Sequence, residues 1–326
     1  CSPQPGNKWY FGTSSTLRGR DSYLLVANPF KEEAVVKVRL LTKEGDVVPA
    51  RLKDLLIPEL SQTPVFLAEY FKETESFAVE VAATRGRVVV SRYDRTSMRE
   101  GFKGLTNSLG SRSTSTKWFF AGGETTASGA EFLHLANPSS REALVQIIFQ
   151  TDTEQIAQPA LQEVPVPAGA QVSLNLNEHL PPGVRHGILV LSTNRVPIIA
   201  ERQDFGSIES ARGVDATGGS THTAKAWALS IGSLAGGKQL LSVVNFGTRK
   251  TVLRITILAE GETQPPELTS IAVEAGRRAT IDLTPFLPPQ GGAALVESTT
   301  PDVVVEGRIH FGDPYRDFAD LIAQPL

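Results

Sequence analysis

Apolar and polar residues alternate along several short stretches of this chain. In residues 36–40, Val36, Val38 and Leu40 alternate with Lys37 and Arg39. Because successive side chains of a β-strand point to opposite faces, this pattern predicts a strand with one apolar and one polar face. A helix would need apolar residues at steps of three and four, which this stretch lacks.

The same alternation returns twice along the chain. The three tryptophans repeat at one interval, since Trp9 to Trp118 and Trp118 to Trp227 each span 109 residues of the 326. Repeats of this length are whole domains rather than the turns of a solenoid. The alternating apolar positions of the later copies are Val145, Ile147 and Phe149, and then Leu253, Ile255 and Ile257.

Two polar residue types also recur at fixed places. We interpret the asparagines as caps of the turn that follows the second strand. We interpret the arginines as members of structural ion pairs or donors to loop carbonyls, because an unpaired charge ending an apolar strand is costly. The alternative is a ligand site for a carboxylate or a sugar, but recurrence in every unit favours the structural interpretation. The residues are Asn28, Asn137 and Asn245, and Arg92, Arg202 and Arg308.

Each unit contains six or seven candidate strands separated by turn-prone residues. Short alternating strands at this spacing are typical of a β-sandwich. The sequence therefore predicts an all-β protein of three tandem immunoglobulin-like β-sandwich domains of about 109 residues each. In the second unit the expected strands are 117–122, 131–137, 143–150, 161–167, 170–177, 187–192 and 196–202.

The domain boundaries follow from two segments rich in Gly, Ser and Thr. We interpret both as linkers, although "GLTNSLGS" and "GVDATGGS" resemble each other, which indicates ordered parts of the repeat. The predicted division is a tether at 1–7, sandwiches at 8–103, 117–212 and 226–313, linkers at 104–116 and 213–225, and a tail at 314–326.

The C-terminal tail is apolar in part. Phe318, Leu321 and Ile322 have helix-compatible spacing after Asp313 and Pro314. Exposed apolar clusters tend to find a surface, so we expect this tail to pack on the third unit or on a neighbouring copy. The alternative is a disordered terminus.

Composition limits the classes of function. The chain is 40% hydrophobic and 21% charged, as in ordinary globular proteins, and its net charge of −3 argues against a nucleic-acid-binding surface. No apolar run approaches the roughly 20 residues of a membrane-spanning helix.

The sequence offers little support for catalysis. The stretch 232–239, "GSLAGGKQ", resembles a phosphate-binding loop, but Gln239 stands where Ser or Thr must contact magnesium. The five histidines lack metal-ligand spacing, there is a single cysteine, and no G-x-S-x-G elbow occurs. We therefore predict no catalytic residue, no cofactor and no metal site, and hence a protein that is not an enzyme.

The single cysteine is the first residue, Cys1. One interpretation is the processed N-terminus of a bacterial lipoprotein, with a lipid on Cys1 and the polar run 2–7 as a tether. The other is that this cysteine is incidental to where the sequence starts. Neither provides a disulfide, so we expect the fold to depend on its core alone.

Three short motifs together resemble a known repeat. They are W-[YF]-F-x-G, a later N-P and a final E-R. The second unit matches them best, the first has Ser91 in place of the glutamate, and the third is looser with "EGR". Such units are similar to an uncharacterised family of bacterial envelope repeats in exported proteins of actinobacterial and related type. In the second unit the matching residues are Trp118, Phe119, Phe120, Gly122, Asn137, Pro138, Glu201 and Arg202.

The resemblance implies a location and a fold but no catalytic residue. We expect a non-enzymatic protein of the cell surface or a periplasm-like space, with a structural, adhesion or assembly role. Its expected partners are other envelope proteins or copies of itself, and it would meet a membrane only through a lipid on Cys1. The alternative function is polysaccharide binding by loops at one end of the sandwiches. We expect the tryptophans to anchor the cores rather than to stack on sugars.

Overall fold

The computed structural model describes residues 4–97, 101–208, 211–232, 237–259, 262–288, 291–311 and 318–326. These residues form β-strands and short 3-10 helices, with no α-helix among them. The all-β prediction is therefore confirmed. No helix in the described ranges is long and apolar enough to cross a membrane.

The strands fall into three sets that follow the sequence repeat. We call residues 4–112, 113–221 and 222–326 the first, second and third repeats. The first contains β1 (Lys8–Phe11), β2 (Arg20–Asn28), β3 (Ala34–Thr42), β4 (Gly45–Val47), η1 (Ala50–Leu52), β5 (Leu55–Ile57), β6 (Ser61–Phe66), η2 (Leu67–Glu69), β7 (Ala78–Arg85), β8 (Val89–Ser97) and β9 (Lys103–Leu109).

The second and third repeats reproduce this order. The second contains β10 (Lys117–Glu124), β11 (Ala130–Ala136), β12 (Ala143–Gln150), β13 (Gln155–Ile156), η3 (Pro159–Leu161), β14 (Val164–Val166), β15 (Gln171–Asn175), η4 (Leu176–Glu178), β16 (Arg185–Ser192), β17 (Ile199–Ile208) and β18 (Ala211–Gly218). The third contains β19 (Ala226–Ile231), β20 (Lys238–Asn245), β21 (Thr251–Leu258), β22 (Glu262–Thr263), η5 (Pro266–Leu268), β23 (Ile271–Val273), β24 (Arg278–Asp282), η6 (Thr284–Phe286), β25 (Gly292–Ser298), β26 (Val303–His310), β27 (Phe318–Ile322) and β28 (Gln324–Pro325).

Each repeat consists of two antiparallel sheets. In the first repeat one sheet has the order β1-β7-β3-β4, with β5 beside β3, and the other has the order β6-β2-β8-β9. The second repeat pairs β10-β16-β12-β13 and β14 in one sheet and β15-β11-β17-β18 in the other. The third repeat has β24-β20-β26-β27 and a sheet of β22-β21-β25-β19-β28 with β23.

A hydrophobic cluster lies between the two sheets of each repeat. Val36, Val38 and Leu40 of β3 are fully buried, as their alternation predicts, and they pack in a cluster with Leu24 of β2 and Val90 of β8. Because apolar side chains of both sheets meet in one core, the arrangement is consistent with β-sandwiches.

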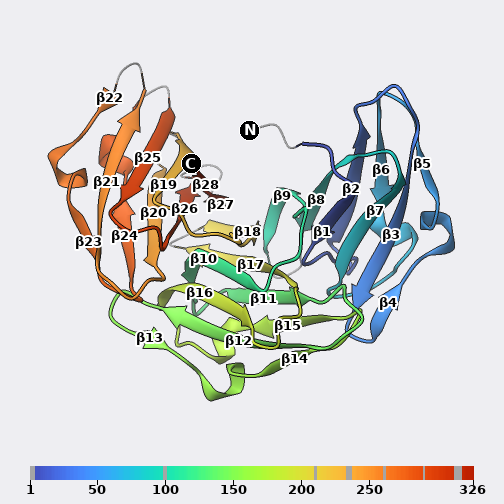
Figure 1. Cartoon of the computed structure of the whole chain (residues 1–326), viewed down its shortest axis with the longest axis horizontal. Helices are drawn as coiled ribbons and strands as arrows, with labels where there is room; N and C mark the ends of the chain where they lie inside the picture. Colours follow the sequence, from blue (N-terminus) through green and yellow to red (C-terminus); the bar gives the residue numbers. More distant parts are fainter. Residues whose placement is uncertain are drawn as a thin grey trace.

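The cores continue across the boundaries between repeats. Tyr10 and Leu41 of the first repeat belong to the cluster of the second repeat. Phe119 and Ala121 of the second repeat belong to that of the third. We call the contact of the first and second repeats the first joint and that of the second and third the second joint. The three repeats form an arc, with the hairpins β8–β9, β17–β18 and β26–β27 on its inner side (Figure 1).

The structure corrects the interpretation of the two linkers. Residues 103–109 form β9, which pairs with β8, and residues 211–218 form β18, which pairs with β17. Beyond them, Ser111 pairs with Tyr10 and Ser220 pairs with Phe119, so the chain returns to its own repeat before leaving it. These segments are therefore strands at the edges of their sheets rather than free linkers.

The C-terminal tail is also corrected. Phe318–Ile322 forms the strand β27 beside β26 rather than a helix, and β28 pairs with β19, which carries Trp227. The tail therefore packs on the third repeat, as expected, and completes it in the way that β9 and β18 complete the others. The predicted tether is joined to the first repeat at Gly6, which pairs with Val88, whereas Cys1 lies outside the described residues.

Candidate functional site

A buried ion pair holds the first joint. The guanidinium group of Arg92 contacts the carboxylate of Glu201 at 2.5 Å, and the two side chains are 0% and 6% exposed. Arg92 also donates to Asp94 and to the carbonyl of Thr13 within its own repeat. Glu201 accepts a hydrogen bond of 2.7 Å from the backbone N–H of Gly12 in the first repeat. Arg92 is thus held both by its own repeat and by Glu201 of the second, and Glu201 binds the first repeat through Arg92 and Gly12.

The second joint repeats this arrangement one repeat later. Arg202 donates to Glu306 at 3.3 Å, and both side chains are buried. Glu306 accepts hydrogen bonds of 2.8 Å from the backbone N–H groups of Ala121 and Gly122. An arginine of one repeat thus binds a glutamate of the next, and that glutamate binds the backbone three or four residues after the tryptophan. We call Arg92–Glu201 and Arg202–Glu306 the joint pairs.

A glycine three or four residues after the tryptophan leaves room for the carboxylate at each joint. A Cβ atom on Gly12 would lie 2.6 Å from Cβ of Glu201, and one on Gly122 would lie 2.8 Å from Oε2 of Glu306. Contacts this short between a Cβ and another heavy atom force a displacement. Each joint therefore uses a glycine for the close approach of the next repeat, Gly12 at the x position of W-[YF]-F-x-G and Gly122 at its glycine position.

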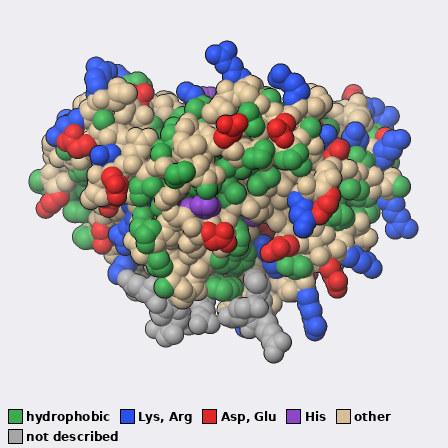
Figure 2. Space-filling view, turned by 90° about the horizontal axis from the view of Figure 1, so that it is seen from below, with side chains coloured by type: hydrophobic (Ala, Val, Ile, Leu, Met, Phe, Trp, Pro, Cys, Tyr) green, Lys and Arg blue, Asp and Glu red, His purple; other side chains and the backbone are tan. Residues whose placement is uncertain are grey.

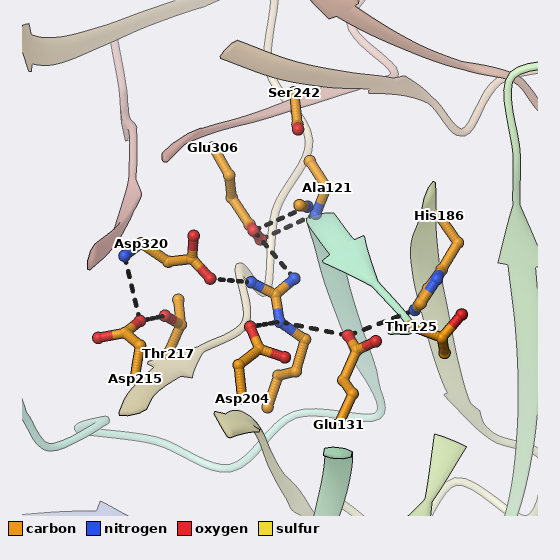
Figure 3. Close-up of polar contacts among 12 residues, drawn as sticks. Ala121, Thr125, Glu131, His186, Asp204, Asp215, Thr217, Ser242, Glu306 and Asp320 are labelled. Carbon is orange, nitrogen blue, oxygen red and sulfur yellow. Dashed lines mark hydrogen bonds and ion pairs between the residues drawn. The ribbon is translucent and has the colours of Figure 1, made fainter. Parts of the chain in front are cut away.

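The second joint contains a larger charged cluster (Figure 3). Asp320, Asp204, Glu306 and Glu131 all point toward one centre, where the guanidinium group of Arg202 lies. Arg308 adds a second guanidinium group beside Asp204 and Asp320. The N–O distances from Arg202 are 2.6 Å to Asp320, 3.4 Å to Asp204 and 3.7 Å to Glu131, and those from Arg308 are 2.5 Å to Asp320 and 2.8 Å to Asp204.

The cluster contains more carboxyl groups than arginines, and the pKa values of its carboxyl groups are shifted in different directions. Burial alone would raise the pKa of Asp320, but attraction to Arg308 and Arg202 lowers it to about 2. Burial, together with repulsion from Glu131 and Asp320, raises the pKa of Asp204 well above its usual range despite the two arginines. The shifts in opposite directions make Asp204 the carboxyl group that takes up a proton more readily than Asp320, which limits the net negative charge.

A histidine extends the cluster in the second repeat. Nε2 of His186 lies 3.4 Å from Oε1 of Glu131, and both side chains are buried. Burial would raise the pKa of Glu131, but His186, followed by Arg202, outweighs it and lowers that pKa. Gly123 faces both groups, because a Cβ there would lie 2.4 Å from Nε2 of His186. At the place of His186 the first repeat has Phe77, so this pair is particular to the second repeat.

The arrangement of this cluster is that of a closed joint. Its charged side chains are at most 8% exposed, so a substrate has no access to them in this structure. No group of three or more His, Cys, Asp or Glu side chains in the described ranges is placed to hold a metal ion. What these groups can do here is to hold neighbouring repeats in one geometry through charge-assisted hydrogen bonds.

Comparisons with known proteins identify the family. A family model described as "Family of unknown function (DUF5719)" matches residues 1–100 and 95–325. The chain belongs to this family. A search of the curated proteins finds no relative. The match agrees with the prediction that the chain belongs to an uncharacterised family.

Two solved structures show distant similarity to this DUF5719 chain. A Thermotoga maritima protein, entitled "Crystal Structure of Thermotoga maritima 1070", is 15% identical over 34% of this chain and 97% of its own, with a TM-score of 0.29. A Streptomyces avermitilis alpha-L-rhamnosidase complexed with L-rhamnose is 9% identical over 92% of this chain and 38% of its own, with a TM-score of 0.19.

The structure places the tryptophans and asparagines of the repeat inside the sandwiches. Trp9, Trp118 and Trp227 are at most 2% exposed, and their indole N–H groups donate to the carbonyls of Val88, Ile198 and Val303. The asparagines bridge the turn after the second strand. Asn28, Asn137 and Asn245 each donate to the carbonyl four residues later and accept from the backbone N–H two residues later.

One arginine of the sequence pattern is not equivalent to the other two. Arg92 pairs with Leu24 and Arg202 with Leu133, but the corresponding Leu241 pairs with Gly307. Arg308 is shifted by one residue and lies on the opposite face of its strand, toward Asp320. The sequence motif hides this shift, because "EGR" and "ER" look alike when residue types alone are matched.

Several residues of the cluster are not predicted by the sequence motifs. A signal is present for two of them, since Arg92 and Arg202 are each followed two residues later by an aspartate, Asp94 and Asp204. Asp320 gives no such signal, because it lies in a strand that pairs only in the folded third repeat. Glu131 and His186 lie 55 positions apart in sequence, and only the sandwich brings them together.

Asp215 supplies a test of the cluster by pH. Burial, with repulsion from Asp320, raises the pKa of Asp215 to about 7, although Thr217 and the Asp320 N–H donate to it. The folded state therefore holds a proton more tightly than the unfolded chain. This group's contribution to stability is complete below about pH 4 and decreases as pH rises toward 7.

Replacing Asp215 with asparagine should remove this pH dependence. We expect the variant to match the wild type near pH 4 and to be more stable by about 1–3 kcal/mol above pH 7. The expected gain is smaller than the full pKa shift would give, because Asp215 is partly exposed to solvent. Urea unfolding at several pH values measures the difference. Asp54→Asn, at an exposed position, serves as the control. A D215N variant that is less stable than the wild type at pH 8 would contradict the assignment.

Proposed function

We propose that this protein is a non-enzymatic assembly module of the cell envelope. In this proposal its three repeats are tandem immunoglobulin-like sandwiches that act as one rigid body. The observation that carries the proposal is the pair of joints, in which a buried arginine of one repeat binds a buried glutamate of the next. Tandem domains connected only by flexible linkers would move independently, whereas buried charged joints fix their relative orientation.

The surface is compatible with a structural role. Lys and Arg side chains lie mainly toward the edges of the face seen in Figure 2, and its centre mixes hydrophobic and polar side chains. A net charge of −3 gives the protein as a whole no electrostatic attraction to nucleic acid. These features support an interaction with other proteins, including copies of the same chain.

Distances between spin labels test the rigid body. Labels on Lys53→Cys in the first repeat and Glu267→Cys in the third, both exposed, should give one narrow distance distribution in a Cys1→Ser background. The distribution should be unchanged at high salt, because buried ion pairs are screened much less than exposed ones. Labels on Lys31→Cys and Lys53→Cys, within the first repeat, give the reference width. A distribution much broader than this reference would refute the rigid module.

The envelope location is tested separately. With its native upstream sequence in its own cells, the protein should fractionate with membranes, and Cys1→Ala should release it. The physical reason is that an acyl chain adds about 0.8 kcal/mol of membrane affinity for each buried CH₂ group. Recovery of both forms in the same soluble fraction would remove the anchor from the proposal and leave the rigid module intact.

A further inference from the structure

Both joints bring together the same two faces of a repeat. We define the front face as the solvent side of the sheet that begins with the tryptophan strand. We define the back face as the solvent side of the other sheet. At the first joint, Gln171 of the second repeat's back face donates to the carbonyl of Gly12, at the end of the first repeat's tryptophan strand. At the second joint, Arg278 of the third repeat's back face donates to the carbonyl of Ala121 at 2.9 Å.

Side-chain burial at equivalent positions shows the same pairing, in which the front face of one repeat covers the back face of the next. Ala136 and Ile199 on the back face of the second repeat are 2% and 4% exposed. Val244 and Val304 on the back face of the third repeat are 0% exposed. Their equivalents by strand register in the first repeat are Ala27 and Val89, and both remain partly exposed. The back face of the first repeat is thus the one back face of the three without a covering front face among the described residues.

This uncovered back face is apolar over its centre. Tyr23, Leu25 and Tyr93 are partly exposed there, and Leu109 on the edge strand β9 is 55% exposed. A contiguous apolar area of this kind on a soluble protein marks an interaction surface.

The ring geometry on this face argues for a protein partner rather than a sugar. The ring of Tyr23 stacks on that of Phe66 with centroids 4.6 Å apart and an interplanar angle of 19°. Rings stacked in this way turn their faces toward one another and not outward. They therefore offer no flat platform for a pyranose ring, whereas their edges and the leucines suit an apolar protein surface.

One front face is also left uncovered, that of the third repeat. Ala228, Ala293 and Leu295 are partly exposed there, and Leu258 is 37% exposed. At the position of Ala228, the two covered front faces carry the aromatic residues Tyr10 and Phe119. At this position the free front face has a small residue where the formed joints have an aromatic one, and the free back face carries the aromatic residues Tyr23 and Tyr93. Their sizes are therefore complementary.

The charges of the two free faces are compatible as well. The back face of the first repeat carries Asp21 and Arg95, and the front face of the third carries Arg254 and Glu297. Both faces thus carry charges of both signs, and Lys103 of β9 adds a positive charge to the back face by its register with β8, so the faces do not repel as surfaces of like charge.

A contact between the two free faces would lack both members of the arginine–glutamate pair. Ser91 stands where the glutamate would be on the free back face, and Gly307 stands where the arginine would be in the third repeat. Removing both members of a buried pair leaves no charge unpaired, so the contact stays possible. Without charge-assisted bonds it should be weaker than the two internal joints.

We propose that the back face of the first repeat binds the front face of the third repeat of a second copy. Successive copies then join head to tail, in the geometry that the chain already uses twice internally. The first and third repeats form the two ends of the arc, so both faces belong to terminal repeats (Figure 1). This inference rests on the proposed assembly role, and its failure would leave the rigid joints, which the spin-label distances test, unaffected.

Complementation between two blocked variants tests this proposal. The weight-average mass of the wild type, measured by sedimentation equilibrium, should at least about double between low micromolar and submillimolar concentration. Leu25→Lys blocks the back face and Leu295→Lys blocks the front face, so each variant alone should stay monomeric. Their equimolar mixture should form a dimer and nothing larger, because one free face of each kind remains.

The controls distinguish this contact from non-specific association and from misfolding. Leu56→Lys changes an exposed leucine on the other sheet of the first repeat, 46% exposed, and should associate like the wild type. Circular dichroism and thermal unfolding establish that each variant is folded. A wild type that stays monomeric throughout overturns the proposal. So does a Leu295→Lys variant that still dimerises, since that result indicates a two-fold contact through the back face alone.

Discussion

Replacing Arg202 with methionine is expected to lower the free energy of unfolding by about 3–5 kcal/mol, the usual effect of removing one partner from a buried charged group. Arg202 contacts Glu306, Asp204 and Asp320 in the second joint. Methionine fills part of the space but leaves these carboxyl groups without their central cation. They must then take up protons or draw in water, and either response weakens the joint.

Equilibrium unfolding in urea measures the loss. The matched control is Arg254→Met, which changes an exposed arginine on β21 of the third repeat and should alter stability by less than about 0.5 kcal/mol. The Arg202 variant should also regain stability at low pH, where the neighbouring carboxylates become neutral. A loss below about 1 kcal/mol at neutral pH would mean that the cluster does not depend on Arg202.

The first joint should yield a large coupling energy in a double-mutant cycle. Arg92→Met and Glu201→Leu are each expected to cost about 2–4 kcal/mol, because each leaves a buried charge with fewer partners. The double variant should cost less than the sum of the two by about 2 kcal/mol, since it leaves neither member of the pair alone. Arg92 retains Asp94 in the Glu201 variant, which keeps that single loss at the lower end of the range.

An exposed pair in the first repeat provides the comparison. Arg95 and Asp21 also approach to 2.5 Å, but their side chains are 63% and 24% exposed. The corresponding cycle, Arg95→Met with Asp21→Leu, should give a clearly smaller coupling, because exposed ion pairs contribute little to stability. Equal couplings in the two cycles would show that burial at the joint adds nothing, and the role assigned to Arg92 and Glu201 would then be wrong.

The joint pairs also account for an irregularity of the repeat. The first repeat has Ser91 at the glutamate position, and in the third Gly307 occupies the arginine position. Each of these repeats retains only the half of the pair that faces the second repeat. A glutamate at 91 or an arginine at 307 would have no partner within the described part of the chain. The looser match of these two units to the motif therefore follows from their places in the array.

The strands of the second repeat were largely predictable from local alternation. The expected strands 143–150 and 117–122 correspond to β12 (Ala143–Gln150) and β10 (Lys117–Glu124). The short β13 and the edge strand β18 were missed, because two residues give no period and because Gly213 and Gly218 disguise a strand. The tail was misassigned for a related reason, since Phe318, Leu321 and Ile322 fit a helix when the partner strand β26 is unknown.

The sequence alone determined the all-β class, the threefold repeat and the burial of the tryptophans, because these depend on alternation within short segments and on one recurring interval. Only the tertiary structure decided which charged residues meet. Arg92 and Glu201 are 109 residues apart, and Arg202 and Glu306 are 104 apart. Such pairs form because one repeat docks on the next in a single register, and a shift of one residue, as at Gly307 and Arg308, moves a side chain to the opposite face of its strand.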